Sequence, residues 1–164
     1  MNKSIFNIWI YQLMKRLMGV EWSKKILSKK YIKQYQKSDI IFIHIPKAAG
    51  TSIANEIYGK RNGHLTASQV VKILGKDEFN RKFSFSISRN PYDRLVSSYF
   101  YAVQGGSIDG GITNSSMYKT NEFSDFSSFV KNWLVFQDLN SIDLIFRPQY
   151  LVCHSFQFRW YENQ

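Results

Sequence analysis

Hydrophobic and polar residues divide the chain into two parts near residue 38. The first part has an apolar stretch between Ile5 and Met18 and then a run of lysines. Polar residues interrupt this stretch and basic residues close it, well short of the ~20 apolar residues that a membrane-spanning helix needs. We expect residues 1–37 to form a separate basic amphipathic helical segment. It either makes peripheral contact with an anionic membrane surface or packs against the core or a partner.

From residue 38 onward, short apolar runs alternate with amphipathic stretches, which is typical of an α/β domain. Ile40–Ile45 is almost entirely β-branched and predicts a parallel strand covered on both faces. Apolar residues at helical spacing predict a helix over Thr51–Lys60 and a second over Ala67–Leu74, which ends at Gly75. We therefore expect residues 38–164 to form a domain in which helices flank a parallel sheet.

The order of strand, loop and helix then repeats. Phe83–Ser88 alternates as a strand, and Asn90-Pro91 supplies the N-cap and first turn of a helix that runs to about Val103. Residues 104–121 are rich in Gly, Ser and Asn and predict an exposed loop. Aromatic and apolar residues at helical spacing predict a further helix over Asp125–Leu134.

Composition says more about the class of binding partner than about the fold. The chain has 164 residues and 44% apolar content, which suits a single buried core. Its formal net charge of +10 favours an anionic partner: a nucleotide, a nucleic acid, a sulfated or phosphorylated substrate, or a membrane surface. A single cysteine, Cys153, and three histidines without zinc-ligand spacing exclude a disulfide scaffold and a structural metal site.

The first candidate site is the segment HIPKAAGTS, residues 44–52. A strand that enters a loop of small residues and then a hydroxyl-bearing helix start aims backbone amides at a phosphate, and Lys47 adds a full positive charge. The segment differs from a Walker A loop because Lys47 precedes Gly50 by three residues, and no Mg²⁺-binding element follows the second strand. A plain nucleotide triphosphatase is thus disfavoured. The loop alone leaves open a simple β–α turn with an exposed lysine.

The second candidate site follows the second strand. Arg89 stands at the end of that strand, and Ser97 lies about two turns into the next helix. Such a pair can hold one phosphate from two sides. Alternatively, Arg89 pairs with Asp93, and the Ser97 hydroxyl bonds back to its own helix. Two such motifs on two strand-to-helix junctions favour a paired anion site.

Together, HIPKxxGTS and RNPYDRLVSxY resemble the two cofactor motifs of the PAPS-dependent sulfotransferases (sulfotransferase family 2), in the branch of the carbohydrate sulfotransferases and their bacterial relatives. The resemblance runs from about Asp39 to Gln149. It implies a P-loop-like fold and a sulfuryl donor, 3′-phosphoadenosine 5′-phosphosulfate (PAPS), used without a metal. It also implies a hydroxyl-bearing acceptor, with a glycan as the first candidate. It places these residues at the 5′-phosphosulfate: Lys47, Ala48, Ala49, Gly50, Thr51 and Ser52. It places Arg89 and Ser97 at the 3′-phosphate.

Sulfuryl transfer also needs a base for the hydroxyl proton and positive charge at the leaving oxygen, a role that suits Lys47. His64 is the candidate base, because it follows the first helix in a short loop and matches a GHxTA element of the family. The alternative is a surface histidine that caps the next helix. We expect His44, inside the strand, to be structural. If His64 is not the base, Glu56 and His44 are the next candidates for that role. Arg147, in a segment that resembles the family's RPQ element, either adds to the anion-binding surface or merely precedes a turn proline.

Phe158–Asn163 resembles a turn that the family reaches later, so we expect the chain to be truncated at its C-terminus. We then expect the truncation to reduce catalysis more than the binding of PAP, the adenosine 3′,5′-bisphosphate that remains when PAPS loses its sulfuryl group. We expect a cytoplasmic protein, with possible peripheral contact at the inner face of the membrane through residues 1–37.

The rival function is a catalytically inactive PAPS- or PAP-binding protein, or a basic module that binds nucleic acid or membrane. No aromatics interleave with the lysines, so we expect no specific nucleic-acid partner. Neither the acceptor nor the oligomeric state follows from the sequence.

Overall fold

The computed structural model describes residues 31–106, 111–112 and 114–153. Among these residues, strands β1 (Ile40–Ile43) and β2 (Phe83–Ser86) pair in parallel, with Ile40 opposite Phe83. The parallel pairing confirms the prediction. Each strand ends two residues earlier than predicted, because the pairing stops after Ile43 and Ser86 and the chain enters the two loops that carry the candidate motifs. The predicted turn over Phe158–Asn163 lies outside the described residues.

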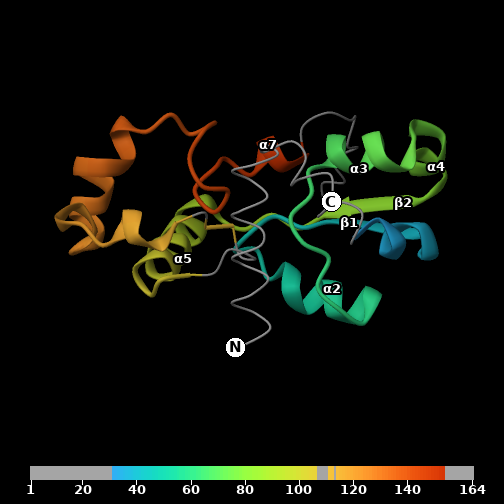
Figure 1. The fold of residues 1–164 in the computed structure, drawn as a ribbon, viewed down its shortest axis with the longest axis horizontal. Helices are drawn as coiled ribbons and strands as arrows, with labels where there is room; N and C mark the ends of the chain where they lie inside the picture. The colour runs from blue at the N-terminus through green and yellow to red at the C-terminus, as the bar shows by residue number, and fades with distance from the viewer. Residues whose placement is uncertain (1–30, 107–110, 113, 154–164) are drawn as a thin grey trace, which may run out of the picture.

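Helices cover both faces of this small sheet (Figure 1). α2 (Gly50–Tyr58) lies on one side of the strands, and α3 (Ala67–Leu74) and α4 (Lys76–Arg81) lie on the other. α2 begins and ends slightly earlier than predicted, because the left-handed Gly59 terminates it and donates its N–H to the carbonyl of Asn55. α3 has the predicted bounds, and α4 was not predicted.

The first core forms around β1. Ile41 and Ile43 are fully buried and pack with Tyr35, Val70 and Val152. Burial of each such aliphatic side chain contributes about 1.5–3 kcal/mol relative to exposure. Tyr35 belongs to the helical residues 31–37, so the last part of the predicted N-terminal segment packs against the core. The earlier residues of that segment lie outside the described part of the chain.

Side chains hold the edge of β1 that does not pair with β2. The Tyr58 hydroxyl accepts a hydrogen bond from the Phe42 N–H (2.8 Å) and donates to the Ile40 carbonyl (3.0 Å). The Asn62 side-chain amide, which is fully buried, donates to the Phe42 carbonyl (2.9 Å). These bonds satisfy backbone groups that would otherwise be unpaired, and they fix α2 and the loop after it against the strand.

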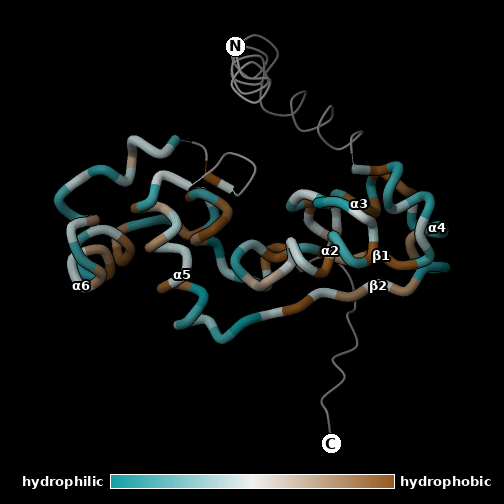
Figure 2. Tube along the Cα trace, turned by 90° about the horizontal axis from the view of Figure 1, so that it is seen from below, coloured by the Kyte–Doolittle hydropathy of each residue, from teal (hydrophilic) through white to brown (hydrophobic). Residues whose placement is uncertain are grey.

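A second, aromatic core lies at the other end of the molecule (Figures 1 and 2). Its longest helix is α5 (Pro91–Val103). Asn90 caps this helix as predicted, because its side chain accepts hydrogen bonds from the backbone N–H groups of Tyr92 and Asp93. Short helical elements complete it: η2 (Ser115–Tyr118), η3 (Asn121–Phe123), α6 (Phe126–Ser128), η4 (Phe129–Trp133) and η5 (Leu134–Phe136). The predicted helix over Asp125–Leu134 is present as α6 and the π-helical η4, with Asp125 as its N-cap.

The prediction of an exposed loop over residues 104–121 is wrong in part. Ile112 and Tyr118 are buried in the aromatic core, and Tyr118 lies in η2. Burial of these two side chains outweighs the loop-like composition of the residues around them.

The chain returns from the second core to the first through residues 144–153. Ile145 and Phe146 pack in the aromatic core, whereas Val152, in α7 (Tyr150–Cys153), packs beside β1. The Ser98 hydroxyl of α5 donates to the Ile145 carbonyl (2.8 Å). Among the described residues, no helix combines the length and apolar character required to cross a membrane.

Candidate anion-binding site

The site forms where β1 ends and α2 begins. Lys47 (φ 66°) and Ala49 (φ 58°) both adopt left-handed backbone conformations, which are uncommon for residues with a side chain. Such alternation turns successive backbone amides toward one concave side, which is how anion-binding nests form. Ala49 is also the N-cap of α2 and supplies no side-chain cap. The amides of the first turn of α2 therefore suit an anionic ligand.

The loop rests on the buried ring of His44. A Cβ atom at Gly50 would lie 2.7 Å from His44 Cγ and closer still to Cδ2 and Nε2, so only glycine fits there. The His44 side chain is 6% exposed, stacks on Phe42, and has its ring centroid 4.2 Å from that of His64. Burial, followed by the nearby charge of His64, lowers the pKa of His44 to about 4. His44 is thus neutral at pH 7 and supports the loop, as expected of a structural residue.

Two cations meet at the loop. The Lys47 ammonium lies 4.1 Å from the centroid of the Tyr101 ring on α5, a cation–π distance. The Arg89 guanidinium lies beside the same loop, with one nitrogen 3.5 Å from the Lys47 carbonyl oxygen. Burial and the charge of Arg89 lower the pKa of Lys47. An anion bound here would relieve this repulsion and would stabilise both charges.

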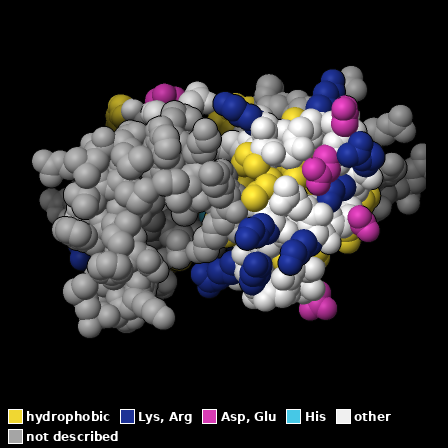
Figure 3. Space-filling view, turned by 45° about the vertical axis from the view of Figure 1, so that its right-hand side comes forward, with side chains coloured by type: hydrophobic (Ala, Val, Ile, Leu, Met, Phe, Trp, Pro, Cys, Tyr) yellow, Lys and Arg dark blue, Asp and Glu magenta, His cyan; other side chains and the backbone are white. Residues whose placement is uncertain are grey.

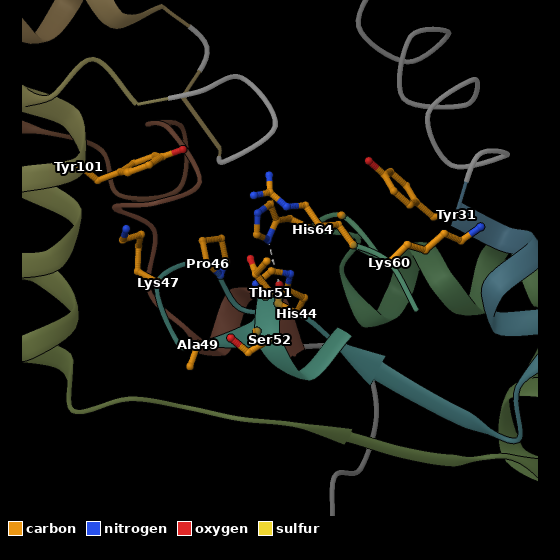
Figure 4. Close-up of a pocket in the computed structure, with 13 residues that line it drawn as sticks. Tyr31, His44, Pro46, Lys47, Ala49, Thr51, Ser52, Lys60, His64 and Tyr101 are labelled. Carbon is orange, nitrogen blue, oxygen red and sulfur yellow. Dashed lines mark hydrogen bonds between the residues drawn. The ribbon is translucent and has the colours of Figure 1, made fainter. Parts of the chain in front are cut away.

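A pocket of about 500 Å³ opens beside the loop, which is a size typical of small-ligand sites. Figure 4 shows Lys47 and Tyr101 on one side of it and Tyr31 and Lys60 on the other, with His64 between them. Six of the predicted site residues line the pocket: Lys47, Ala49, Gly50, Thr51, Ser52 and His64.

Three predicted site residues lie outside the pocket lining. Ala48, a residue of the loop, is buried and packs in the first core. Arg89 is exposed and reaches the loop from the end of β2, and Ser97 is half-buried on α5. The two motifs thus meet at Arg89 and Lys47, while the structure does not bring Ala48, Arg89 and Ser97 into the pocket.

One backbone contact orients the His64 ring. Its Nδ1 atom lies 3.3 Å from the His44 carbonyl oxygen. A carbonyl only accepts, so this contact is a hydrogen bond when Nδ1 carries the proton, which makes Nε2 the proton-accepting nitrogen. The alternative that His64 caps the next helix is wrong, because Thr66 caps α3. Glu56 is exposed on α2 and does not line the pocket.

The turn that presents His64 depends on its neighbours. Gly63 has φ +69°, and a Cβ there would lie 2.6 Å from the Tyr31 ring. Buried Asn62 anchors the turn to β1 through the Phe42 carbonyl. No local pattern predicts this anchor, because the partner lies 20 residues away.

Arg94 is a structural contributor that sequence reasoning missed. Its guanidinium is 5% exposed and donates to the carbonyls of Pro46 and Arg147, both at 2.9 Å. Burial lowers its pKa to about 10, so it stays charged at pH 7. Arg147 itself donates to the carbonyl of Ile142 (2.6 Å) within its own loop, which agrees with a role in the turn.

Several cations lie at the site. Lys47, Lys60 and Arg61 line the pocket, and Arg89 reaches the loop. Figure 3 shows further lysine and arginine side chains on the described part of one face, with acidic side chains among them. Within residues 31–106, 111–112 and 114–153, no group of His, Cys, Asp and Glu is arranged to hold a metal ion. The groups that the described site presents to an anion are therefore backbone amides, hydroxyls and cations.

Comparison with known proteins shows the family of the chain. A family model described as "Sulfotransferase family" matches residues 30–162. The match includes both strand–loop–helix units, β1–α2 and β2–α5. No curated protein and no solved structure matches the chain.

Proposed function

The chain belongs to the sulfotransferase family, and from this premise we propose that it transfers a sulfuryl group from PAPS to a hydroxyl of a saccharide or another polar acceptor. One observation carries the proposal: Lys47, the first residues of α2 and His64 line a single pocket. An anion site and a proton acceptor are the two groups that this transfer requires.

The residues of the loop fit the donor. Lys47 and the first turn of α2, Gly50 to Ser52, would hold the 5′-phosphosulfate, and Arg89 with Ser97 would hold the 3′-phosphate. PAPS supplies the sulfuryl group and a stable leaving group, PAP. Lys47 balances the charge that gathers on the leaving oxygen, and the backbone amides at the start of α2 stabilise the same charge.

His64 serves as the general base. Its Nε2 takes the hydroxyl proton while the acceptor oxygen bonds to sulfur and the bond from sulfur to PAP breaks. The hydrogen bond from Nδ1 to the His44 carbonyl keeps the ring in the tautomer that this step needs. We assign the acceptor to the side of the pocket where Tyr31 and Lys60 lie, opposite Lys47.

Calorimetry of the full chain in EDTA tests the donor assignment. We expect PAP to bind, and ATP to bind at least about tenfold more weakly, because ATP lacks the 3′-phosphate that Arg89 would contact. No binding of PAP, or ATP binding as tight as PAP binding, would contradict the proposal. Retention on DNA that salt reverses, without retention on immobilised PAP, would instead support the rival basic module.

A further inference from the structure

One side chain clamps the backbone of Arg89. The Arg89 N–H donates to Gln149 Oε1 (2.9 Å), and Gln149 Nε2 donates to the Arg89 carbonyl (2.7 Å). Both polar atoms of a single amide thus pair with both backbone groups of one residue, 60 positions away. This pattern reproduces the pairing of a neighbouring strand at a point where the described sheet has none.

Arg89 needs this clamp because neither neighbouring element holds it. β2 ends at Ser86, and α5 begins after its cap, Asn90, so residues 87–89 belong to no ladder or helix. Arg89 is also exposed, so it lacks packing that would fix it. Two exposed hydrogen bonds add little to global stability, but they fix the backbone from which the guanidinium extends toward the loop at Lys47.

The segment that carries Gln149 reaches the two motifs at separate points. Arg94 joins the Arg147 carbonyl to the Pro46 carbonyl, just before the Lys47 loop. Gln149 joins the same segment to Arg89 alone. A change at Gln149 therefore acts on Arg89 and leaves in place the Arg94 bond that holds the start of the first motif at the Pro46 carbonyl.

From this geometry we propose that Gln149 is a positioning residue that sets the selectivity for 3′-phosphorylated nucleotides by aiming Arg89. The inference rests on the proposed function, in which Arg89 contacts the 3′-phosphate. A purely structural role would weaken all nucleotides alike. A positioning role weakens only those that carry the 3′-phosphate, because Lys47 and the α2 amides are unchanged.

The test compares the affinities of PAP and 5′-AMP, which lacks only the 3′-phosphate, for the full chain. The variants are Gln149→Ala and Gln149→Glu; the latter keeps the size but loses the N–H donor to the Arg89 carbonyl. Gln137→Ala is the matched control, because its amide donates to the Trp133 carbonyl (3.1 Å) within its own turn. We expect the affinity ratio of PAP to 5′-AMP to fall about tenfold in both Gln149 variants, as for a lost charge-assisted contact, and to stay unchanged in the control.

The outcomes separate this inference from the proposed function. If the unmodified chain shows no preference for PAP over 5′-AMP, the assignment of the 3′-phosphate site fails. If it prefers PAP and a folded Gln149 variant keeps the full ratio, the positioning role of Gln149 is overturned while the proposed function stands. Loss of folding in both variants would also overturn it, since the clamp would then serve the fold.

Discussion

Substitution of Gly50 by alanine tests the contact on which the anion loop rests. Helix propensity alone would make this change favourable by up to about 1 kcal/mol, because alanine forms helices better than glycine. The added methyl, however, would lie 2.7 Å from His44 Cγ and nearer to two other ring atoms. Ordinary carbon contacts need about 3.5–4.0 Å, so the ring or the start of α2 must move by on the order of 1 Å.

The ring has little room to move, because His44 is buried between the rings of Phe42 and His64. Overpacking of this kind costs about 1–3 kcal/mol, so we expect the steric term to exceed the propensity term and Gly50→Ala to destabilise the chain. Displacement of the first-turn amides should also weaken PAP binding. Urea unfolding and calorimetry measure the two effects, and Asn55→Ala, on the exposed side of α2, is the control.

A double-mutant cycle isolates the contact. In a His44→Ala background the ring is absent, so Gly50→Ala should cost less there by about 1–2 kcal/mol. If Gly50→Ala leaves both stability and PAP affinity unchanged, or costs the same in both backgrounds, the argument that His44 supports the loop is refuted.

Three further predictions concern the charged and titrating groups. Lys47→Ala and Arg89→Ala should each weaken PAP binding by about 2 kcal/mol, the cost of a charge-assisted phosphate contact, and calorimetry showing unchanged affinity would argue against the paired site. His64→Ala should lower turnover by roughly 10² or more with little change in PAP affinity, and a variant with full turnover would move the base elsewhere. The free energy of unfolding should fall as the pH drops from 6.5 to about 4, because His44 takes up a proton in the unfolded chain first. The loss should be at most about 3 kcal/mol, it should be absent in His44→Gln, and a pH-independent free energy of unfolding across this range would contradict the burial argument.

The sequence pattern predicted those elements whose start, end or type depends on neighbouring residues in the chain. The β-branched run at β1, the Asn90-Pro91 start of α5 and the end of α3 at Gly75 each depend on residues adjacent in sequence, and the structure confirms all three. The loop predicted between the first strand and the first helix also depends on adjacent residues, and it lies between β1 and α2. The prediction for residues 104–121 was partly wrong because two of their side chains, Ile112 and Tyr118, pack in the aromatic core against residues distant in sequence.

The missed contributors act through partners distant in sequence. Arg94 binds a carbonyl 48 positions away, and Gln149 binds Arg89 across 60 positions. Asn62 supports the His64 turn by contacting β1. No spacing rule predicts such bonds, because any buried carbonyl can serve as the acceptor. For Arg94 a weak signal existed, since it lies in the same motif as Ser97 on α5.

Transfer of labelled sulfate is the direct test of the proposed sulfotransferase activity. The full chain would be incubated in EDTA with PAPS labelled in its sulfuryl group and a panel of glycan and small-molecule hydroxyl acceptors, beside the Lys47→Ala and His64→Ala variants. We expect label to move to at least one acceptor with the release of PAP, and we expect both variants to lose this transfer while His64→Ala still binds PAP. Label that remains on PAPS across the panel, or transfer that persists undiminished in both variants, would contradict the proposed activity.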